Sequence, residues 1–426
     1  MRILVVGSGG REHALSWRLR QGGAAGEIFA SPGNGGTAME GVNCAVRDSD
    51  VPGLVHLAKE KRIDLVVAGP EMPLVEGLTE AMAKAGIPCF GPDAFAARLE
   101  GSKAFAKNLM RETGVPTADF AVFDDYAKAR AHVLHRDEPM VVKADGLAAG
   151  KGVVVAATRA EALAALDDMM VKKIYGPAGD TVIVEDALIG EEASFLAFCD
   201  GETITPLPAC QDHKPVGEGD TGPNTGGMGA YCPAPVLPES RYAGMAEIAI
   251  RPIVAALAAK GHPFKGVLYA GLMMTPAGPY VLEYNVRFGD PECQPLLMRL
   301  DGDLADIMLA CVEGRLGKIR VGWKSETAIC VVMAAKGYPG SYPKGMEISG
   351  LDEAEKLNGV KVFQAGTMLA GGKIVSCGGR ILGVTALGKG LAEAKSRAYA
   401  AIGKIKFDHA FYRRDIGDKG LIREGM

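Results

Sequence analysis

Three side chains near residue 285 have the types and the spacing to hold a metal ion beside a phosphate group. Residues 281–292 read VLEYNVRFGDPE, in which polar and apolar residues alternate as they do on a β-strand. Because alternate side chains of a strand share a face, Glu283, Asn285 and Arg287 would point the same way. Carboxylate and amide oxygens suit Mg²⁺, and a guanidinium balances phosphate or carboxylate charge. An ordinary half-exposed strand is the alternative interpretation. The residues that would face a core are Leu282, Tyr284, Val286 and Phe288.

A second candidate site is the glycine-rich loop within residues 141–155, VVKADGLAAGKGVVV. The loop joins two predicted strands, the first of which carries Lys143, and it is longer than the roughly two to five residues of an ordinary hairpin. Small residues such as Gly150 leave the backbone amides accessible, and Lys151 adds positive charge where a triphosphate would lie. The loop does not match the Walker A pattern, because Gly152 follows the lysine and a strand comes next. A flexible surface hairpin is the alternative.

Three further loops could bind a phosphorylated ligand. The first, GSGGRE, follows a strand and opens a helix, so its amides and the positive helix end would face an anion. Glu12 occupies the third glycine position of the dinucleotide fingerprint, and the acid expected about 20 residues later is missing. A nicotinamide-dependent oxidoreductase is therefore disfavoured. The loops GNGGT (33–37) and GPE (69–71) also follow strands, so all three would meet at one sheet edge, unless they serve only as turns.

The elements that must position these loops begin with an α/β unit. Buried apolar strands that alternate with helices indicate a doubly wound parallel sheet with helices on both faces. We expect strands at 3–6, 63–68 and 87–90 and helices at 12–20 and 74–85.

The rest of the chain changes pattern twice. We expect a helix at 93–113, strands at 139–144, 152–157 and 181–185, and a helix at 159–172. Residues 191–312 have an α+β pattern, with strands at 193–199, 267–274 and 280–287 and a helix near 239–260. Residues 211–229 form a long loop rich in Gly, Pro and Asp, and such loops are usually functional or disordered. From 326 onward, short strands and a helix at 390–406 indicate a small last domain.

Composition excludes several classes of protein. Lys and Arg total 47 against 51 Asp and Glu, so the net charge of −4 gives no global attraction to nucleic acid or to an anionic membrane. Nine scattered cysteines without a CxxC pair argue against a zinc site or a disulfide framework. Met1-Arg2 leads directly into ILVVG, and the longest apolar runs are shorter than the roughly 18 residues of a membrane span. We expect a cytoplasmic protein of about three domains with small-molecule partners, no nucleic-acid partner and no membrane partner.

The motifs together resemble a known superfamily. Lys103 on a helix, Lys143 before the glycine-rich loop, EDALIGEE (185–192) and E-x-N (283–285) resemble the ATP-grasp enzymes. Within them, the chain is similar to the phosphoribosylamine–glycine ligases, also called glycinamide ribonucleotide synthetases. GPNTGGMGAY separates that family from other ATP-grasp enzymes. The other matching stretches are VVGSGGREHA (5–14), GNGGT (33–37), GPEMPL (69–74), KADGLAAGKGV (143–153), QDHKPVGEGDTGPNTGGMGAY (211–231), EYNVRFGDPE (283–292), QAGT (364–367) and GGRILGVTALG (378–388).

The resemblance implies an ATP-grasp fold with flanking domains. Residues 1–102 would be the N-terminal doubly wound α/β domain that binds phosphoribosylamine. Residues 103–325 would be the ATP-grasp domain, with a lid subdomain at about 119–190. Residues 326–426 would form a small C-terminal α+β domain, which would either complete the active site or only brace it.

The resemblance also implies a set of nucleotide contacts. Lys103 and Lys143 would contact the ATP phosphates under a lid loop containing Gly150, Lys151 and Gly152. Glu185 and the backbone of Leu188 would lie at the adenine hinge, and Glu192 would hold the ribose. Glu283 and Asn285 would bind Mg²⁺ or Mn²⁺. Many ATP-grasp relatives carry a further metal-binding acid on the preceding strand, but GVLYAGLMM has none, so a second metal ion is in question.

The substrate contacts follow in the same way. The 5′-phosphate of phosphoribosylamine would lie near Gly9, Gly10, Asn34, Gly35 and Thr37, and its ribose near Glu71. Glycine would lie near Asp212, Asn224, Thr225, Gly226 and Asp290. Arg287, Lys143 and Asp212 would be the catalytic residues, with Arg287 stabilising the transferring phosphoryl group.

The activity implied is ATP-dependent joining of glycine to phosphoribosylamine through glycyl phosphate. Another ATP-grasp carboxylate–amine ligase or a carboxylase of purine synthesis is the main alternative, and a regulatory nucleotide-binding module is another. A regulatory module would not need Glu283, Asn285 and Arg287 on one face. The sequence does not determine the oligomeric state; a monomer is favoured.

Overall fold

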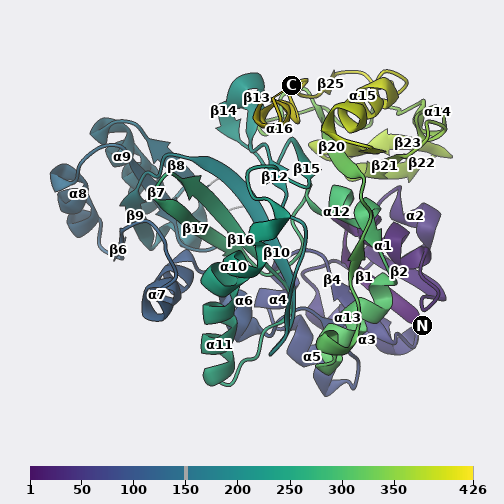
Figure 1. The fold of residues 1–426 in the computed structure, drawn as a ribbon, viewed down its shortest axis with the longest axis horizontal. Coiled ribbons are helices and arrows are strands. Elements are labelled where there is room, and N and C mark those ends of the chain that lie inside the picture. Colours follow the sequence, from purple (N-terminus) through teal and green to yellow (C-terminus); the bar gives the residue numbers. More distant parts are fainter. Residues whose placement is uncertain (148–151, 426) are drawn as a thin grey trace.

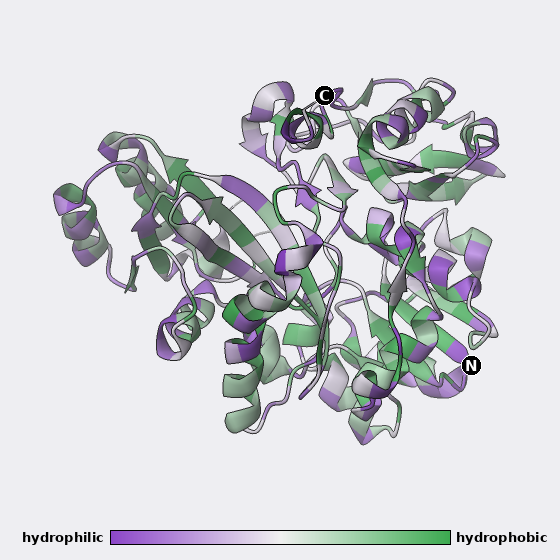
Figure 2. Ribbon diagram, in the orientation of Figure 1, coloured by the Kyte–Doolittle hydropathy of each residue, from purple (hydrophilic) through white to green (hydrophobic). Residues whose placement is uncertain are grey.

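The computed structural model describes residues 1–147 and 152–425. Within these residues, four sheets have at least four strands each. In Figure 1 the N-terminal unit (purple) and the C-terminal unit (yellow) lie on one side, and the sheet that carries β7, β8 and β9 lies on the other. In Figure 2 the strands are largely hydrophobic, whereas hydrophilic residues gather on the helices and loops around them.

The N-terminal unit is a parallel sheet with helices on both faces, as predicted. Its five strands run in the order β3 (Val42–Asn43), β2 (Glu27–Pro32), β1 (Arg2–Gly7), β4 (Leu65–Ala68) and β5 (Cys89–Phe90). Alternate residues of β1 enter different cores. Leu4 and Val6 pack in the core that includes Leu54 of α3 (Val51–Glu60), and Ile3 and Val5 pack in the core that includes Leu15 of α1 (Gly10–Arg20).

Two helices predicted to be continuous are broken. The helix expected at 74–85 is α4 (Met72–Val75) and α5 (Leu78–Lys84), because Gly77 between them has a φ of 86°. The helix expected at 93–113 is α6 (Ala94–Gly101) and α7 (Lys103–Thr113). Ser102 between them is extended, and its hydroxyl caps α7 by accepting from the Phe105 amide. The break places Lys103 at the start of a helix rather than in the middle of one.

A separate antiparallel sheet has its own small core. Its strand order is β6 (Phe120–Phe123), β9 (Val182–Asp186), β7 (Met140–Ala144) and β8 (Val153–Ala156). Helices α8 (Tyr126–His135) and α9 (Arg159–Leu166), with the π-helical turn Asp167–Val171, supply apolar residues to that core. β7 and β8 pair from Met140↔Ala156 to Lys143↔Val153, so the glycine-rich loop begins where their pairing ends.

The central sheet carries the predicted metal strand. It is antiparallel, in the order β11 (Ile204–Pro206), β10 (Glu191–Asp200), β16 (Lys265–Thr275) and β17 (Gly278–Asn285). A β-bulge interrupts β17, because Glu283 pairs with Gly271 whereas Val281 pairs with Leu272. Leu282 is therefore the extra residue, and it lines a cavity instead of entering the core. The prediction was wrong for Leu282, while the predicted core residues Tyr284, Val286 and Phe288 are buried.

The helical stretch Glu239–Ala259 is long and apolar enough, by length and composition alone, to cross a membrane. It comprises the 3₁₀ turn Glu239–Arg241, α10 (Tyr242–Met245), the π-helical turn Ala246–Ile250 and α11 (Arg251–Ala259). Many of its apolar residues, among them Ile250, Ile253 and Leu257, lie in the main hydrophobic core of the protein, whereas Ile248 is exposed. The stretch is apolar because one face of it packs in the protein core.

The C-terminal sheet includes two strands from the middle of the chain. Its order is β12 (Gln211–Asp212), β15 (Gly229–Cys232), β20 (Thr327–Ala335), β24 (Arg380–Gly388) and β21 (Val360–Gln364), and β25 (Ala410–Phe411) also pairs with β20. Residues 211–229, predicted as a loop, instead contain β12, the hairpin β13 (Pro215–Gly217) and β14 (Thr221–Asn224), and the start of β15. The sheet thus crosses the predicted boundary at 325/326.

The remaining elements complete the C-terminal half. Helices α12 (Cys293–Arg299) and α13 (Leu304–Glu313) pack against α1, and α12 also contacts β20 and β24. The outer elements are α14 (Leu351–Glu355), β22 (Thr367–Ala370), β23 (Lys373–Ser376), α15 (Leu391–Ile402) and α16 (Asp418–Arg423).

Candidate active site

A cavity of about 590 Å³ lies where all these units meet. Its walls include Glu71 of the N-terminal unit, Glu185 of β9, Glu283 of β17 and Arg380 of β24. Most of the residues predicted from the sequence line it: Glu71, Lys103, Lys143, Gly152, Glu185, Leu188, Glu192, Asp212, Asn224, Thr225, Gly226, Glu283, Asn285, Arg287 and Asp290. The structure therefore brings together residues as far apart in the chain as Glu71 and Asp290.

Two of the three predicted phosphate loops of the N-terminal unit lie beside this cavity rather than in its wall. Gly9, Gly10, Asn34, Gly35 and Thr37 are not among its lining residues, although a side chain on Gly9 would come within 3.2 Å of the Asp290 carboxylate. Gly150 and Lys151 lie outside the described residues.

The part of the cavity lined by α7, β7 and β9 contains a buried cluster of two lysines and one glutamate. Lys143 Nζ lies 2.5 Å from Glu185 Oε1, and Lys107 Nζ donates to Glu185 Oε2 at 2.5 Å. Burial, reinforced by the neighbouring ammonium of Lys143, lowers the pKa of Lys107 to about 8, although Glu185 opposes the shift. Sequence reasoning missed Lys107. Its position one helical turn after Lys103, in KAFAK, was the signal that could have found it.

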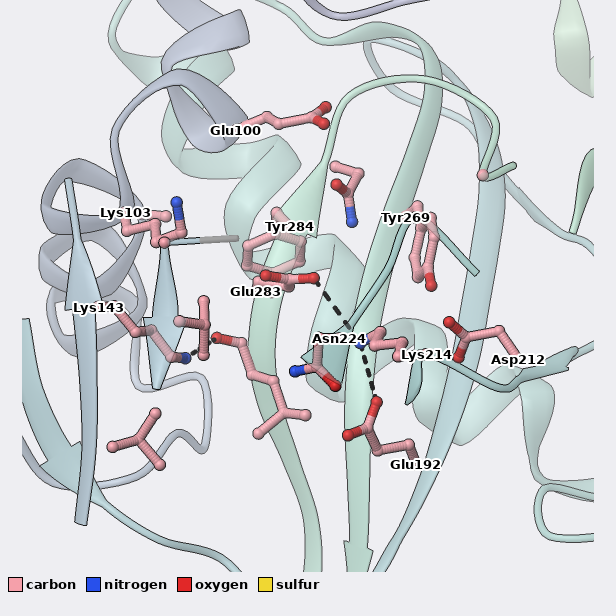
Figure 3. Close-up of a pocket in the computed structure, with 18 of the residues that line it drawn as sticks. Glu100, Lys103, Lys143, Glu192, Asp212, Lys214, Asn224, Tyr269, Glu283 and Tyr284 are labelled. Carbon is pink, nitrogen blue, oxygen red and sulfur yellow. Dashed lines mark hydrogen bonds and ion pairs between the residues drawn. The ribbon is translucent and has the colours of Figure 1, made fainter. Parts of the chain in front are cut away.

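Lys103 and Lys143 both approach Glu283 from the same side. Figure 3 shows their ammonium groups on one side of the Glu283 carboxylate, with Lys214 on the other. Lys103 Nζ donates to Gly146 O at 2.9 Å. Burial lowers the pKa of Lys103, and the positive charge of Lys143 adds to the shift, while Glu283 opposes it. Positive charge is therefore concentrated where the resemblance expects triphosphate oxygens.

Glu283 and Asn285 offer the oxygen atoms that a magnesium ion prefers. Both line the cavity, and Asn285 Oδ1 accepts from Arg287 Nη2 at 3.2 Å. Within residues 1–147 and 152–425, no group of three or more His, Cys, Asp or Glu side chains could enclose a metal ion. Gly271, which pairs with Glu283 on β16, supplies no second acid. Two protein oxygens fit Mg²⁺ that is bound together with substrate phosphates, which is how proteins commonly hold this ion.

Arg287 is held by two carboxylates, one of which was not predicted. Its Nη2 contacts Glu100 Oε1, and its Nε lies 3.4 Å from Glu71 Oε2. Glu100 also accepts from the Val286 amide at 2.8 Å. Burial raises the pKa of Glu100 to about 7 against the effect of Arg287. Although burial opposes it, Glu100 and Glu71 raise the pKa of Arg287, which stays charged.

The loop Gly33–Thr37 is shaped by the side chain of Asn34. Its Nδ2 lies within 3.0 Å of three carbonyl oxygens, those of Ser8, Gly9 and Gln364, and its Oδ1 accepts from the amides of Gly36 and Thr37. These partners occupy the polar atoms of the side chain. Asn34 therefore positions the loop, and the loop's other groups remain for a ligand.

The C-terminal region forms hydrogen bonds with the same loop. Gly35 N donates to Thr367 O at 3.2 Å, and Gln364 N donates to Nδ1 of the buried His13 at 2.8 Å. The motif QAGT (364–367) thus connects the C-terminal region to the loop Gly33–Thr37 and to His13 of α1.

Arg380 connects the C-terminal sheet to the cavity wall. Its Nη1 donates to Gly226 O at 2.5 Å and to Asp290 O at 2.7 Å, and its Nη2 donates to Asp290 Oδ2 at 2.9 Å. Although burial opposes the shift, Arg380 and Arg11 lower the pKa of Asp290, so its carboxylate is charged. Residues 326–426 therefore contribute directly to the wall, through Arg380 and Tyr338. Sequence reasoning placed no site residue there.

Asp212 and Lys214 line the far side of the cavity. Lys214 Nζ lies 2.8 Å from Glu192 Oε2 and 3.9 Å from Glu283 Oε1. Burial raises the pKa of Asp212 to about 7; Lys214 opposes the shift, whereas Glu292 and two further glutamates add to it. Although burial opposes it, Glu192, Asp212 and Glu283 raise the pKa of Lys214 well above its usual range. Lys214 was not predicted as a site residue.

The fold and the cavity define an ATP-grasp protein: two antiparallel sheets enclose a lysine-rich site, and a parallel α/β unit adjoins it. Three family models of phosphoribosylglycinamide synthetase match the chain. The N-domain model matches residues 1–100, the ATP-grasp (A) domain model residues 101–293 and the C-domain model residues 328–419. Curated relatives named phosphoribosylamine–glycine ligase agree. The one from Rhodopirellula baltica is 52% identical and covers 99% of this chain and 98% of its own. The one from Brucella melitensis is 50% identical and covers 100% and 99%.

Solved structures support the same assignment. Phosphoribosylamine–glycine ligase from Thermotoga maritima superposes with a TM-score of 0.85 at 32% identity, covering 98% of this chain and 100% of that one. A biotin carboxylase from Campylobacter jejuni, at 15% identity and a TM-score of 0.75, covers 99% and 95% and shows the shared fold alone. The chain belongs to the phosphoribosylglycinamide synthetase family, and it is a carbon–nitrogen ligase.

Proposed function

We propose that the protein uses ATP to join glycine to 5-phosphoribosylamine, giving glycinamide ribonucleotide in purine synthesis. The observation that carries the proposal is the cavity itself. It places three cations, Lys103, Lys143 and Arg287, around the oxygens of Glu283 and Asn285, next to glycine loops suited to a sugar phosphate. The names of the relatives, which cover nearly the whole chain, identify the two substrates.

The reaction proceeds in two steps because a carboxylate is a poor electrophile. A carboxylate oxygen of glycine attacks the γ-phosphorus of ATP, the bond from phosphorus to the β,γ-bridging oxygen breaks, and ADP leaves. The amine nitrogen of phosphoribosylamine then attacks the carbonyl carbon of glycyl phosphate. The carbon–oxygen bond to phosphate breaks, phosphate leaves with the electron pair, and the nitrogen loses one proton as the amide forms.

Neither step requires a covalent bond to the enzyme, so the protein contributes position and charge. Lys103 and Lys143 hold the triphosphate, and Arg287 stabilises the charge that develops on the transferring phosphoryl group. For Lys143 to do so, its ion pair with Glu185 must open when ATP enters. Glu185 and Leu188 then line the adenine pocket, and Glu192 lies near the ribose.

Glu283 and Asn285 would hold Mg²⁺, which when bound neutralises phosphate charge during transfer. The acceptor occupies the other side of the cavity. The loops at Gly9–Gly10 and Asn34–Thr37 bind the 5′-phosphate, and Glu71 lies near the ribose. The nine cysteines carry free thiols, eight of them buried, which suits the reducing cytoplasm.

The test is ADP release from Mg-ATP, glycine and phosphoribosylamine generated in situ, with each component omitted in turn. We expect ADP and glycinamide ribonucleotide only when all are present. Hydroxylamine should trap glycyl phosphate as glycine hydroxamate. Release of ADP that depends on bicarbonate or on a different carboxylate would replace this function with that of another ATP-grasp enzyme.

A further inference from the structure

The segment that follows β12 presents a carboxylate and an ammonium to the cavity, two residues apart. Asp212 and Lys214 both line the cavity. His213 between them is 1% exposed and faces the other way, with its ring centroid 6.0 Å from that of Tyr231. The segment is extended, because His213 N donates to Gly229 O and Met228 N donates to His213 O, which continues the pairing with β15. Alternate side chains of such a segment project from one face about 7 Å apart.

The backbone of this segment is fixed where Lys214 emerges. Lys214 O accepts from Thr225 N at 2.8 Å and from Thr225 Oγ1 at 2.7 Å. Gln211 Nε2, at the start of the segment, donates to Glu192 O at 2.8 Å. These contacts tie the segment to β10 and to the loop after β14, so the two charged side chains project from a rigid support.

The ammonium of Lys214 can accept a further anion. Glu192 takes one of its hydrogen bonds at 2.8 Å, whereas Glu283 at 3.9 Å is too distant for one. An ammonium has three N–H donors, so donors remain for a ligand. In Figure 3 the Lys214 ammonium stands between Glu283 and Asp212, on the side of Glu283 that is opposite Lys103 and Lys143. Lys214 therefore lies between the proposed triphosphate site at Lys103 and Lys143 and the side chain of Asp212.

We propose that Lys214 is a catalytic residue that holds the glycine carboxylate as it is phosphorylated, with the ammonium of the glycine zwitterion on Asp212, which the family resemblance already places near glycine. The inference rests on the proposed function. The ammonium of glycine pairs with Asp212 and its carboxylate with Lys214, which turns the carboxylate toward Glu283 and the γ-phosphate. The negative surroundings of Asp212 favour a cationic ligand, and Lys214 offsets repulsion between the two anions that must react.

The first experiment compares Lys214→Met with Lys373→Met, a lysine of β23 whose side chain is 62% exposed. Loss of a hydrogen bond to a charged group typically costs a factor of about 10–100. We expect Lys214→Met to raise the glycine KM by about that factor and to lower kcat, while the affinity for ADP changes less than about twofold. Lys373→Met should match the wild type. An equal loss of ADP affinity, or an unchanged glycine KM, overturns the inference.

Two further measurements separate a direct contact from a structural role. Ethylammonium should partly restore amide formation by Lys214→Ala, because it supplies the missing cation. In wild-type protein with ADP, glycine should slow acylation of Lys214 by an amine-reactive reagent at least about fivefold, and glycinamide, which lacks the carboxylate, should not. Equal labelling with and without glycine contradicts the inference even if the variants do not fold. A wild-type enzyme that ignores glycine would instead refute the proposed function.

Discussion

The two sides of the cavity are held together by different kinds of contact. On the proposed nucleotide side, charged side chains pair with one another, as Lys107 and Lys143 do with Glu185. On the proposed acceptor side, Asn34 and Arg380 bind backbone carbonyl groups, and Arg380 also pairs with Asp290. Ion pairs between side chains can open when a ligand offers new charges, whereas loops fixed through their backbone stay in place. The nucleotide side is therefore built to rearrange, and the acceptor side is built in advance.

The acceptor side is also assembled from distant parts of the chain. Asn34 and Gln364 are separated by 330 residues, and Arg380 and Gly226 by 154. On the proposed nucleotide side, Lys107 and Glu185 are 78 residues apart, although Arg287 pairs with Glu71 across 216 residues. Damage to the C-terminal region should thus impair the acceptor side and spare nucleotide binding.

The largest effect is expected on the nucleotide side, from Arg287→Ala. Removing a donor that stabilises transition-state charge typically lowers kcat by about 10²–10³, and Lys143→Ala should do the same. Glycine-dependent ADP release measures this loss. Arg251→Ala, which removes an arginine that is 48% exposed, is the control. If Arg287→Ala or Lys143→Ala turned over at the wild-type rate, the substituted residue would not stabilise charge in the transition state.

Arg380→Ala tests whether the two sides are separable. The change removes hydrogen bonds to Gly226 and Asp290, so we expect kcat/KM for glycine and phosphoribosylamine to fall by about 10–100-fold. Nucleotide affinity, measured by calorimetry, should change less than about twofold. Arg380→Lys should not restore activity, because one ammonium cannot replace the planar fork of the guanidinium. A parallel loss of nucleotide affinity would show that the sides are coupled.

A pH profile gives a smaller effect on the acceptor side. The pKa of Asp212 is raised to about 7, so below pH 7 the free enzyme carries a protonated Asp212 that cannot pair with an ammonium group. We expect kcat/KM for glycine to be constant above pH 7 and to fall about tenfold per pH unit below it. Asp212→Asn should be less active and should lack this acid limb. A limb that persists in Asp212→Asn would assign the titration to another group.

The smallest effect should come from Asn34→Ala. It removes the hydrogen bonds from Asn34 to the carbonyl oxygens of Ser8, Gly9 and Gln364, of which that of Gln364 is buried, at a cost of about 1–3 kcal/mol in the free energy of unfolding. Asn108→Ala, at an exposed position of α7, is the matched control and should not lower the free energy of unfolding. Denaturant unfolding measures both. Equal losses would mean that the Asn34 side chain is not what holds the loop.

Much of the fold and most of the site could be predicted because their signals are local. Alternating apolar runs identified the parallel sheet, and the two-residue period identified Glu283, Asn285 and Arg287 as neighbours on one face. The same reasoning failed where a local rule was overridden. The extended Ser102 split a helix that its composition would continue, and the bulge at Leu282 turned that residue out of the core.

The sequence by itself determined the family and the class of enzyme, since these depend on residue types at short spacings. Only the tertiary structure decided which charges meet. The pairing of Arg287 with Glu100, the approach of Arg380 to Gly226 and the place of Lys214 between two sides of the cavity have no local signature. They arise because the packing of whole sheets and helices decides which distant segments of the chain are in contact.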